Sequence, residues 1–282
     1  MRILITGARG QVGRELGRTF SPEHDVISTS TEQLDITDSR SLDKIIALKP
    51  ELVIHPAAWT NVDGCALAPD RAYTVNGLGT RRVALACQRL DIPMVYISTN
   101  EVFDGQATEP YLEWDEPRPI NPYARSKLLG EHYVRMLLHR FYIVRIAWVF
   151  GGPRNFVCTI LRLANERPSL RVVDDEVGNP TYAADVADAI CRLIEEPAYG
   201  IYHFVNEGHC SRYDFAREIL RQAGRADVHV EPIKLSEYPR PSTPPRYSVL
   251  RNFVGAADLG IRLPPWQDAL RRFLAANAAG VS

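Results

Sequence analysis

The sequence predicts an α/β protein with a doubly wound parallel sheet and a smaller C-terminal domain. Three observations support this fold class. A glycine-rich turn follows the first short apolar segment, short apolar segments then alternate with longer segments of helical periodicity, and small or polar residues follow four of the short segments. Parallel strands give this alternation because each needs a helical crossover before the next.

The glycine-rich turn follows a predicted strand over residues 2–6. It reads Thr-Gly-Ala-Arg-Gly-Gln-Val-Gly over residues 6–13, and helical periodicity continues to Phe20. These glycines permit a tight exit from the strand, a close approach of backbone to a pyrophosphate, and close packing of helix on sheet. The unpaired N–H groups at the helix start attract phosphate. The turn predicts a Rossmann-type dinucleotide site, with an ordinary glycine-rich turn as the alternative; its residues are Gly7, Arg9, Gly10, Gln11, Val12 and Gly13.

The rest of the first half continues the alternation. Strands are predicted at residues 25–28, 52–55, 93–98 and 142–146, and helices at residues 39–48, 70–90 and 123–139. The carboxyl ends of parallel strands meet at one edge of a sheet, where ligands bind. We therefore expect four segments to converge there: residues 7–13, Ala57-Ala58-Trp59-Thr60, Ser98-Thr99-Asn100 and Ala147-Trp148.

Tyr123 and Lys127 stand four residues apart at the start of the third predicted helix, where Pro122 suits the first helical position. Residues at this spacing share a helix face. A nearby ammonium favours phenolate and lowers the pKa of a tyrosine, so the phenol could exchange a proton at neutral pH. The alternative is a surface helix with an incidental pair.

The second predicted strand ends in Ser28-Thr29-Ser30, with no clear acid directly after it and Asp35 later. An acid directly after this strand would bind the ribose 2′-hydroxyl of NAD, and an arginine would suit the 2′-phosphate of NADP. Neither is evident here. Because nothing strongly repels a phosphate, we predict NADP (NADPH) as the cofactor, with NAD as the second choice.

Composition excludes several classes of protein. The 282 residues carry a formal net charge of −1, which predicts no nucleic-acid or membrane partner. The N-terminus enters a strand pattern at once, and no apolar run could span a bilayer, so we expect a cytoplasmic protein. The five scattered cysteines are predicted to be reduced. The histidines form no cluster with the spacing of metal ligands, so we expect no structural metal. A role for Mg²⁺ stays open.

Six motifs occur in an order that resembles a known family. They are the glycine turn, Leu-Asp-Ile-Thr-Asp (34–38), Ala-Ala-Trp-Thr-Asn-Val-Asp (57–63), Ser-Thr-Asn-Glu-Val-Phe-Asp-Gly (98–105), the Tyr-x-x-x-Lys pair and Arg-Ile-Ala-Trp-Val-Phe-Gly (145–151). The chain resembles the extended short-chain dehydrogenases/reductases, and among them the dTDP-4-dehydrorhamnose reductases. The resemblance covers residues 1–190 well and the remainder loosely.

The resemblance implies specific roles. Tyr123 would protonate the 4-keto oxygen of a hexose, Lys127 would hold the nicotinamide ribose, and Thr99 would orient the carbonyl. Substrate contacts are implied for Thr99, Asn100, Trp148 and Asn155. Further cofactor contacts are implied for Asp35 and Ile36 near the adenine, for Ala57, Ala58 and Thr60, and for Asn76, which would support the loop that borders the cofactor.

One departure bears on the substrate. The family usually has Asp-Tyr where this chain has Asn100-Glu101, so a carboxylate replaces a tyrosine near the sugar. Glu101 could alter substrate preference, or it could be a solvated loop residue.

The domain prediction divides the chain unequally. Residues 1–150 form the dinucleotide-binding domain, and residues 171–200 return to it through a helix over residues 185–194 that Asp185 caps. Residues 151–170 and 201–282 form the substrate-binding domain, which a helix over residues 267–276 closes. Residues 232–247 are rich in proline and carry basic residues that could meet a diphosphate or belong to a linker; these are Lys234, Arg240 and Arg246.

The resemblance implies an oxidoreductase that uses NADPH to reduce dTDP-4-dehydro-L-rhamnose to dTDP-L-rhamnose, and it implies a homodimer. Two alternatives stay open. The first is a nucleotide-sugar epimerase or dehydratase of the same fold. The second is a non-catalytic regulatory subunit that binds dinucleotide, resembling the methionine adenosyltransferase β subunit.

Overall fold

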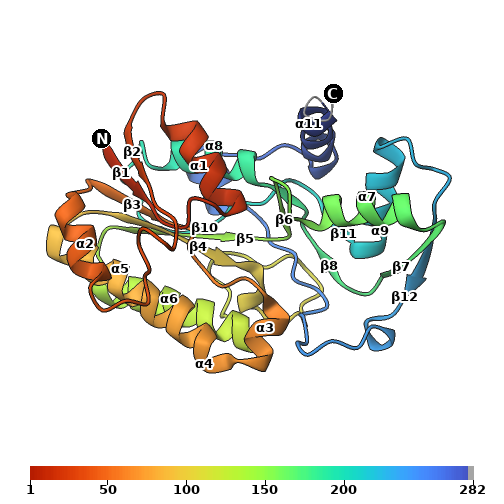
Figure 1. Ribbon diagram of the computed structural model, residues 1–282, viewed down its shortest axis with the longest axis horizontal. Coiled ribbons are helices and arrows are strands. Elements are labelled where there is room, and N and C mark those ends of the chain that lie inside the picture. The colour runs from red at the N-terminus through yellow and green to blue at the C-terminus, as the bar shows by residue number, and fades with distance from the viewer. Residues whose placement is uncertain (279–282) are drawn as a thin grey trace.

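The computed structural model describes residues 1–278, and a six-stranded parallel sheet forms its centre (Figure 1). The strand order is β10-β5-β4-β3-β1-β2. Strand order reverses between β1 and β3, which is the switch point at which doubly wound sheets bind ligands. The strands are β1 (Arg2–Ile5), β2 (Asp25–Ser28), β3 (Leu52–His55), β4 (Met94–Thr99), β5 (Phe141–Ile146) and β10 (Gly200–His203).

Helices cover both faces of this sheet (Figure 1). On one face α1 (Gln11–Phe20) packs against α8 (Ala183–Leu193), and their apolar residues share a core with β1 and β5. The other face carries α2 (Ser41–Leu48), α5 (Thr80–Leu90) and α6 (Pro122–Leu137). The predicted fold class is therefore confirmed, and the five predicted strands agree with β1–β5 within one residue at each end.

The predicted helix over residues 70–90 is not uniform. It consists of α4 (Pro69–Ala72), a π-helical segment, η1 (Tyr73–Gly79), and α5. The wider π turn places Asn76 in the interior, where it is fully buried. The short helix α3 (Val62–Leu67) precedes α4, and the 3₁₀ turn η2 (Asn100–Val102) follows β4.

A smaller group of elements lies beside the carboxyl edge of the large sheet, and we call it the small region (Figure 1). Its core contains Phe150, Phe215 and Trp266. It comprises α7 (Phe156–Glu166), α9 (Arg212–Gln222), α11 (Trp266–Ala278) and the strand pairs β6 (Val149–Phe150) with β9 (Thr181–Tyr182), β7 (Ser169–Val173) with β12 (His229–Ile233), and β8 (Val177–Gly178) with β11 (Cys210–Ser211).

Strand β10 was not predicted, and the predicted domain boundary at residue 200 falls inside it. Because β10 pairs with β5, the chain stays in the large sheet as far as His203. The short helix α10 (Val254–Asp258) contacts β10, and Ile261 and Leu263 also pack into the core of the sheet. The segment after residue 200 therefore contributes to both parts of the molecule. The 3₁₀ turn η3 (Leu235–Glu237) follows β12.

The prediction that Asp185 caps a helix is wrong. Helix α8 begins two residues earlier, at Ala183, so Asp185 lies in its first turn. Its carboxylate accepts hydrogen bonds from Arg272 at 2.7 and 2.8 Å and from Asn206 at 2.6 Å. Asp185 therefore ties α8 to α11, which begins at Trp266 and contains the predicted closing helix.

Candidate active site

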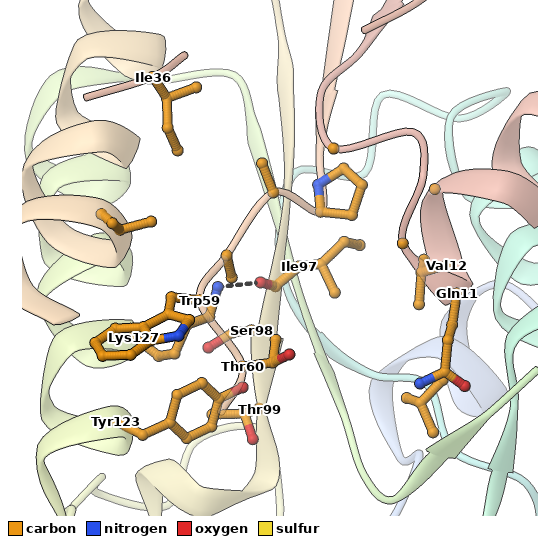
Figure 2. Close-up of a pocket in the computed structure, with 18 of the residues that line it drawn as sticks. Gln11, Val12, Ile36, Trp59, Thr60, Ile97, Ser98, Thr99, Tyr123 and Lys127 are labelled. Carbon is orange, nitrogen blue, oxygen red and sulfur yellow. Dashed lines mark hydrogen bonds between the residues drawn. The ribbon is translucent and has the colours of Figure 1, made fainter. Parts of the chain in front are cut away.

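A cleft of about 1000 Å³ lies beyond the carboxyl ends of β1, β3 and β4. The segments expected to converge do meet here, and Figure 2 shows Gln11 and Val12 across the cleft from Tyr123 and Thr99. Of the predicted site residues, all except Asn76 and Asn155 line it; they are Gly7, Arg9, Gly10, Gln11, Val12, Gly13, Asp35, Ile36, Ala57, Ala58, Thr60, Thr99, Asn100, Tyr123, Lys127 and Trp148.

The glycine loop has the shape that a dinucleotide requires. Gly7 has a φ of +61°, and an added Cβ would lie 2.7 Å from the Cα of Ala57. A Cβ on Gly13 would lie 2.4 Å from the carbonyl oxygen of Gly7. Helix α1 starts after Gly10 with no side-chain cap, so its first N–H groups are available to phosphate. These observations fit NADP or NAD in the cleft.

The cleft beside β2 contains an ion pair that the sequence analysis missed. Nη1 of Arg9 lies 2.8 Å from Oε1 of Glu32, and the Ser30 hydroxyl donates to the other oxygen of Glu32 at 2.5 Å. All three residues line the cleft. The expectation that no acid or arginine stands after the second strand is therefore wrong, because the turn after β2 brings Glu32 back to the glycine loop.

Tyr123, Thr99 and Lys127 form the polar wall of the cleft (Figure 2). The Asn121 side chain caps α6 by accepting from the N–H of Ala124 at 2.9 Å, and Pro122 occupies the first helical position as predicted. This start of α6 presents Tyr123 and Lys127 on one face. The Lys127 ammonium donates to the carbonyl oxygen of Ile97 at 2.7 Å and lies 4.2 Å from the centre of the Tyr96 ring.

The predicted lowering of the Tyr123 pKa is not seen. Burial raises the pKa of Tyr123, the negative charge of Glu101 adds to the rise, and a hydrogen bond with Thr99 opposes it. Burial also lowers the pKa of Lys127 to about 7, although the neighbouring Glu131 favours its charged form. Loss of hydration is therefore the main cause of the shift in both pKa values.

Two asparagines support the cleft. The buried Asn76 side chain accepts from the N–H of Trp59 at 2.7 Å and donates to the Ser126 hydroxyl at 2.9 Å. It therefore fixes the loop after β3 against α6 but does not itself line the cleft. The amide of Asn100 donates to the Ser248 hydroxyl at 2.7 Å, which anchors the end of β4 to the C-terminal part of the chain.

The expected sugar contacts of Trp148 and Asn155 stay predictions, and both side chains also contact neighbouring protein groups. The Arg212 guanidinium lies 3.6 Å from the centre of the Trp148 ring, and Gly178 packs so closely on this ring that an added Cβ would lie 2.6 Å away. Protein groups therefore contact part of this ring, while Trp148 remains half-buried and lines the cleft. Asn155 caps α7, because its side chain accepts from the N–H of Cys158 at 3.0 Å and donates to the carbonyl of Gly152 at 2.8 Å.

The basic residues of the proline-rich segment do not line the cleft. Lys234 pairs with Asp174 at 2.9 Å, and Arg240 pairs with Asp63 at the same distance. The sequence analysis missed two cationic residues that line the cleft, Arg71 and Arg212. Arg212 stands at the first position of α9, and its guanidinium lies against the Trp148 ring. No local signal marks Arg212, because its place depends on packing between distant segments.

Within residues 1–278, no group of three or more histidine, cysteine, aspartate or glutamate side chains is arranged to hold a metal ion. Over the same residues, no helix is both long and apolar enough to cross a membrane.

A doubly wound sheet whose glycine loop faces a Tyr-x-x-x-Lys pair across one cleft defines an extended short-chain dehydrogenase/reductase. The chain belongs to the RmlD substrate binding domain family, whose profile matches residues 1–279. The match includes the C-terminal part, where the sequence analysis found only a loose resemblance.

Relatives with known structures or curated descriptions agree with this family. A dTDP-4-dehydrorhamnose reductase from Clostridium acetobutylicum is 41% identical, with a TM-score of 0.96 over 99% of this chain and 100% of its own. The Bacillus anthracis dTDP-4-dehydrorhamnose reductase, solved in complex with NADP, is 37% identical, with a TM-score of 0.94 over 98% of this chain and 99% of its own. The spore coat polysaccharide biosynthesis protein SpsK of Bacillus subtilis is 39% identical over 97% of this chain and 96% of its own length.

Proposed function

We propose that this protein reduces the 4-keto group of a nucleotide-activated deoxyhexose with NADPH, and that the substrate is dTDP-4-dehydro-L-rhamnose, giving dTDP-L-rhamnose. The main support for this proposal is that Tyr123, Thr99 and Lys127 line the same cleft as the glycine loop. The two similar solved structures, both of dTDP-4-dehydrorhamnose reductases, support the choice of substrate.

The residues that line the cleft support binding of NADPH. The first turn of α1 would hold the pyrophosphate, Asp35 and Ile36 would border the adenine, and Ala57 and Ala58 would border the central part of the cofactor. When bound, NADPH supplies hydride to the keto carbon.

Tyr123 is suited to donate the proton that the keto oxygen requires. Because burial raises the pKa of its phenol, the group remains protonated at neutral pH and is available as an acid. Thr99 lies beside it and would donate a hydrogen bond to the same oxygen, which orients the carbonyl. The ammonium of Lys127 would stabilise the phenolate that is left after proton transfer.

We also propose a cytoplasmic homodimer. The cysteines are all free thiols, as expected in a reducing compartment. Light scattering coupled to size-exclusion chromatography would test the dimer, and a single species at the mass of one chain would contradict it.

The test of function is NADPH oxidation with dTDP-4-dehydro-L-rhamnose, with the product identified by mass spectrometry and NMR. We expect net loss of NADPH absorbance and formation of the reduced sugar. Conversion of the sugar at constant absorbance would instead indicate an epimerase or dehydratase. The Tyr123→Phe variant should lose activity by roughly 100-fold or more and still bind NADPH; undiminished reduction would remove Tyr123 from the mechanism.

A further inference from the structure

Glu101 places a carboxylate in the wall of the cleft, two residues after Thr99. The 3₁₀ turn η2 holds it there, because the hydroxyl of Thr99 accepts from the N–H of Glu101 at 3.2 Å. The residue lines the cleft together with Tyr123 and Arg212. Its charge acts on the reacting phenol, since Glu101 contributes to the raised pKa of Tyr123. Glu101 is therefore not a solvated loop residue.

The two carboxylate oxygens of Glu101 have different surroundings. Oε2 accepts from Nδ2 of Asn121 at 2.7 Å. Asn121 is 1% exposed and is fixed by its cap on α6 and by a hydrogen bond to the carbonyl of Thr243. Among residues 1–278, no hydrogen-bond donor reaches Oε1, and this oxygen is not enclosed by protein atoms. An acceptor without a protein donor therefore remains on a residue that lines the cleft.

The neighbouring cations do not neutralise this acceptor by direct contact. Arg212 is paired with Glu176 at 2.9 Å, and Arg240 is paired with Asp63 at 2.9 Å. Burial and the charge of Glu176 raise the pKa of Glu101, so its carboxylate is incompletely stabilised by the protein alone. A donor on a bound ligand would complete its hydrogen bonding.

We infer that Glu101 is a specificity residue that accepts a hydrogen bond from the 3-hydroxyl of the keto sugar. This inference rests on the proposed function. A 4-keto-6-deoxyhexose bound through its anomeric diphosphate has donors only at carbons 2 and 3. Carbon 3 is bonded to the keto carbon, and Glu101 adjoins Thr99, which would bind the keto oxygen. The 3-hydroxyl is therefore the donor nearest to Glu101.

Glu101→Gln is a sharp test of this contact. The glutamine oxygen can still accept from Asn121, whereas its NH₂ group would face the cleft as a donor in place of the acceptor. Glu109→Gln is the matched control, because it makes the same chemical change at an exposed position outside the cleft. Each variant would be assayed at saturating NADPH with the parent keto sugar and with its 2-deoxy and 3-deoxy analogues.

We expect Glu101→Gln to lower kcat/KM for the parent sugar by roughly tenfold or more, mainly through KM, with NADPH affinity unchanged. The same loss should persist with the 2-deoxy analogue and disappear with the 3-deoxy analogue. A loss that is equal on all three sugars, or absent on the parent, would overturn the inference. Wild-type protein that never consumes NADPH with the parent sugar would overturn the proposed function as well.

If Glu101→Gln fails to bind NADPH, Glu101→Asp replaces it in the same assay. This variant keeps the charge but withdraws the acceptor by one methylene group. A loss confined to sugars that carry the 3-hydroxyl supports the inference, and a loss shared by the 3-deoxy analogue contradicts it.

Discussion

The guanidinium of Arg212 lies 3.6 Å from the centre of the Trp148 ring, and the same guanidinium pairs with Glu176 at 2.9 Å. Arg212 comes from the first turn of α9, whereas Trp148 lies between β5 and β6. Trp148 has a φ of 40°, in the left-handed region that bulky residues avoid. The stack therefore joins the small region to the large sheet at the mouth of the cleft.

Arg212→Ala should weaken sugar binding more than cofactor binding. The substitution removes a cation–π contact and an ion pair, so we expect a loss of roughly 1–3 kcal/mol in unfolding free energy and a several-fold rise in KM for the sugar. Arg217→Ala is the control, because Arg217 lies over Tyr213 on the same helix but outside the cleft. Steady-state kinetics and urea unfolding would measure both effects; equal changes in the two variants would contradict the prediction.

The pair of Arg9 and Glu32 should set the choice between NADPH and NADH. Arg9 is free to exchange Glu32 for a 2′-phosphate, because the pair is largely exposed and contributes little to stability. We expect Arg9→Ala to lower kcat/KM for NADPH by about tenfold with NADH little affected, and Glu32→Gln to weaken NADH selectively. Arg18→Ala is the control, because Arg18 is an exposed arginine on α1 that pairs with Glu15 outside the cleft. If the ratio of kcat/KM for NADPH to kcat/KM for NADH is unchanged in both variants, the pair does not set the choice of cofactor.

Lys127 should make unfolding free energy depend on pH. Its pKa is about 7 in the folded protein and near ~10.4 in an unfolded chain. The unfolded state thus binds the proton more tightly, so the cost of burying the ammonium is full below pH 7 and fades as pH rises toward ~10.

Lys127→Met removes this cost. We expect the variant to exceed wild type by roughly 2–4 kcal/mol at pH 6, less the lost hydrogen bond to Ile97, and the difference to shrink by pH 10. Urea unfolding at several pH values would measure it. A difference that stays constant with pH would show that burial does not depress the pKa of Lys127.

Substitution by alanine should have different effects on stability and cofactor binding at Gly7 and at Gly10. Gly7→Ala combines a positive φ with a backbone collision, so we expect a loss of roughly 2–4 kcal/mol in unfolding free energy. A Cβ on Gly10 meets only the Gly7 carbonyl at 3.3 Å, so Gly10→Ala should fold and lose mainly NADPH affinity. Gly224→Ala, at a φ of +70° with open space around it, measures the cost of the backbone conformation alone. If Gly7→Ala and Gly224→Ala lower the unfolding free energy by the same amount, the backbone collision at Gly7 does not contribute.

The first half of the fold could be predicted because each of its strands is a short apolar segment between turn residues. Strand β10 was missed because Gly-Ile-Tyr-His mixes polar and apolar residues at one edge of the sheet. The cap at Asn121 and the start of α6 at Pro122 follow local rules, and they placed Tyr123 and Lys127 correctly on one face.

The environment of the site could not be predicted from local patterns. The pKa of Lys127 depends on how completely the surrounding chain excludes water, and the partner of Asp185 lies 87 residues away. Asn155 matched a family position, yet its amide is used to cap α7. Arg212 joined the cleft only because distant segments pack together.

The segment after β10 crosses repeatedly between the two parts of the molecule: Ile261 and Leu263 belong to the core of the large sheet, and α11 then packs in the small region, where Arg272 holds Asp185 of α8. Exchanging a single continuous segment with a relative is therefore not expected to change the sugar preference of this protein. A chimera with altered selectivity would have to exchange α7, α9 and the cleft-facing loops together while keeping residues 254–263 from the parent chain.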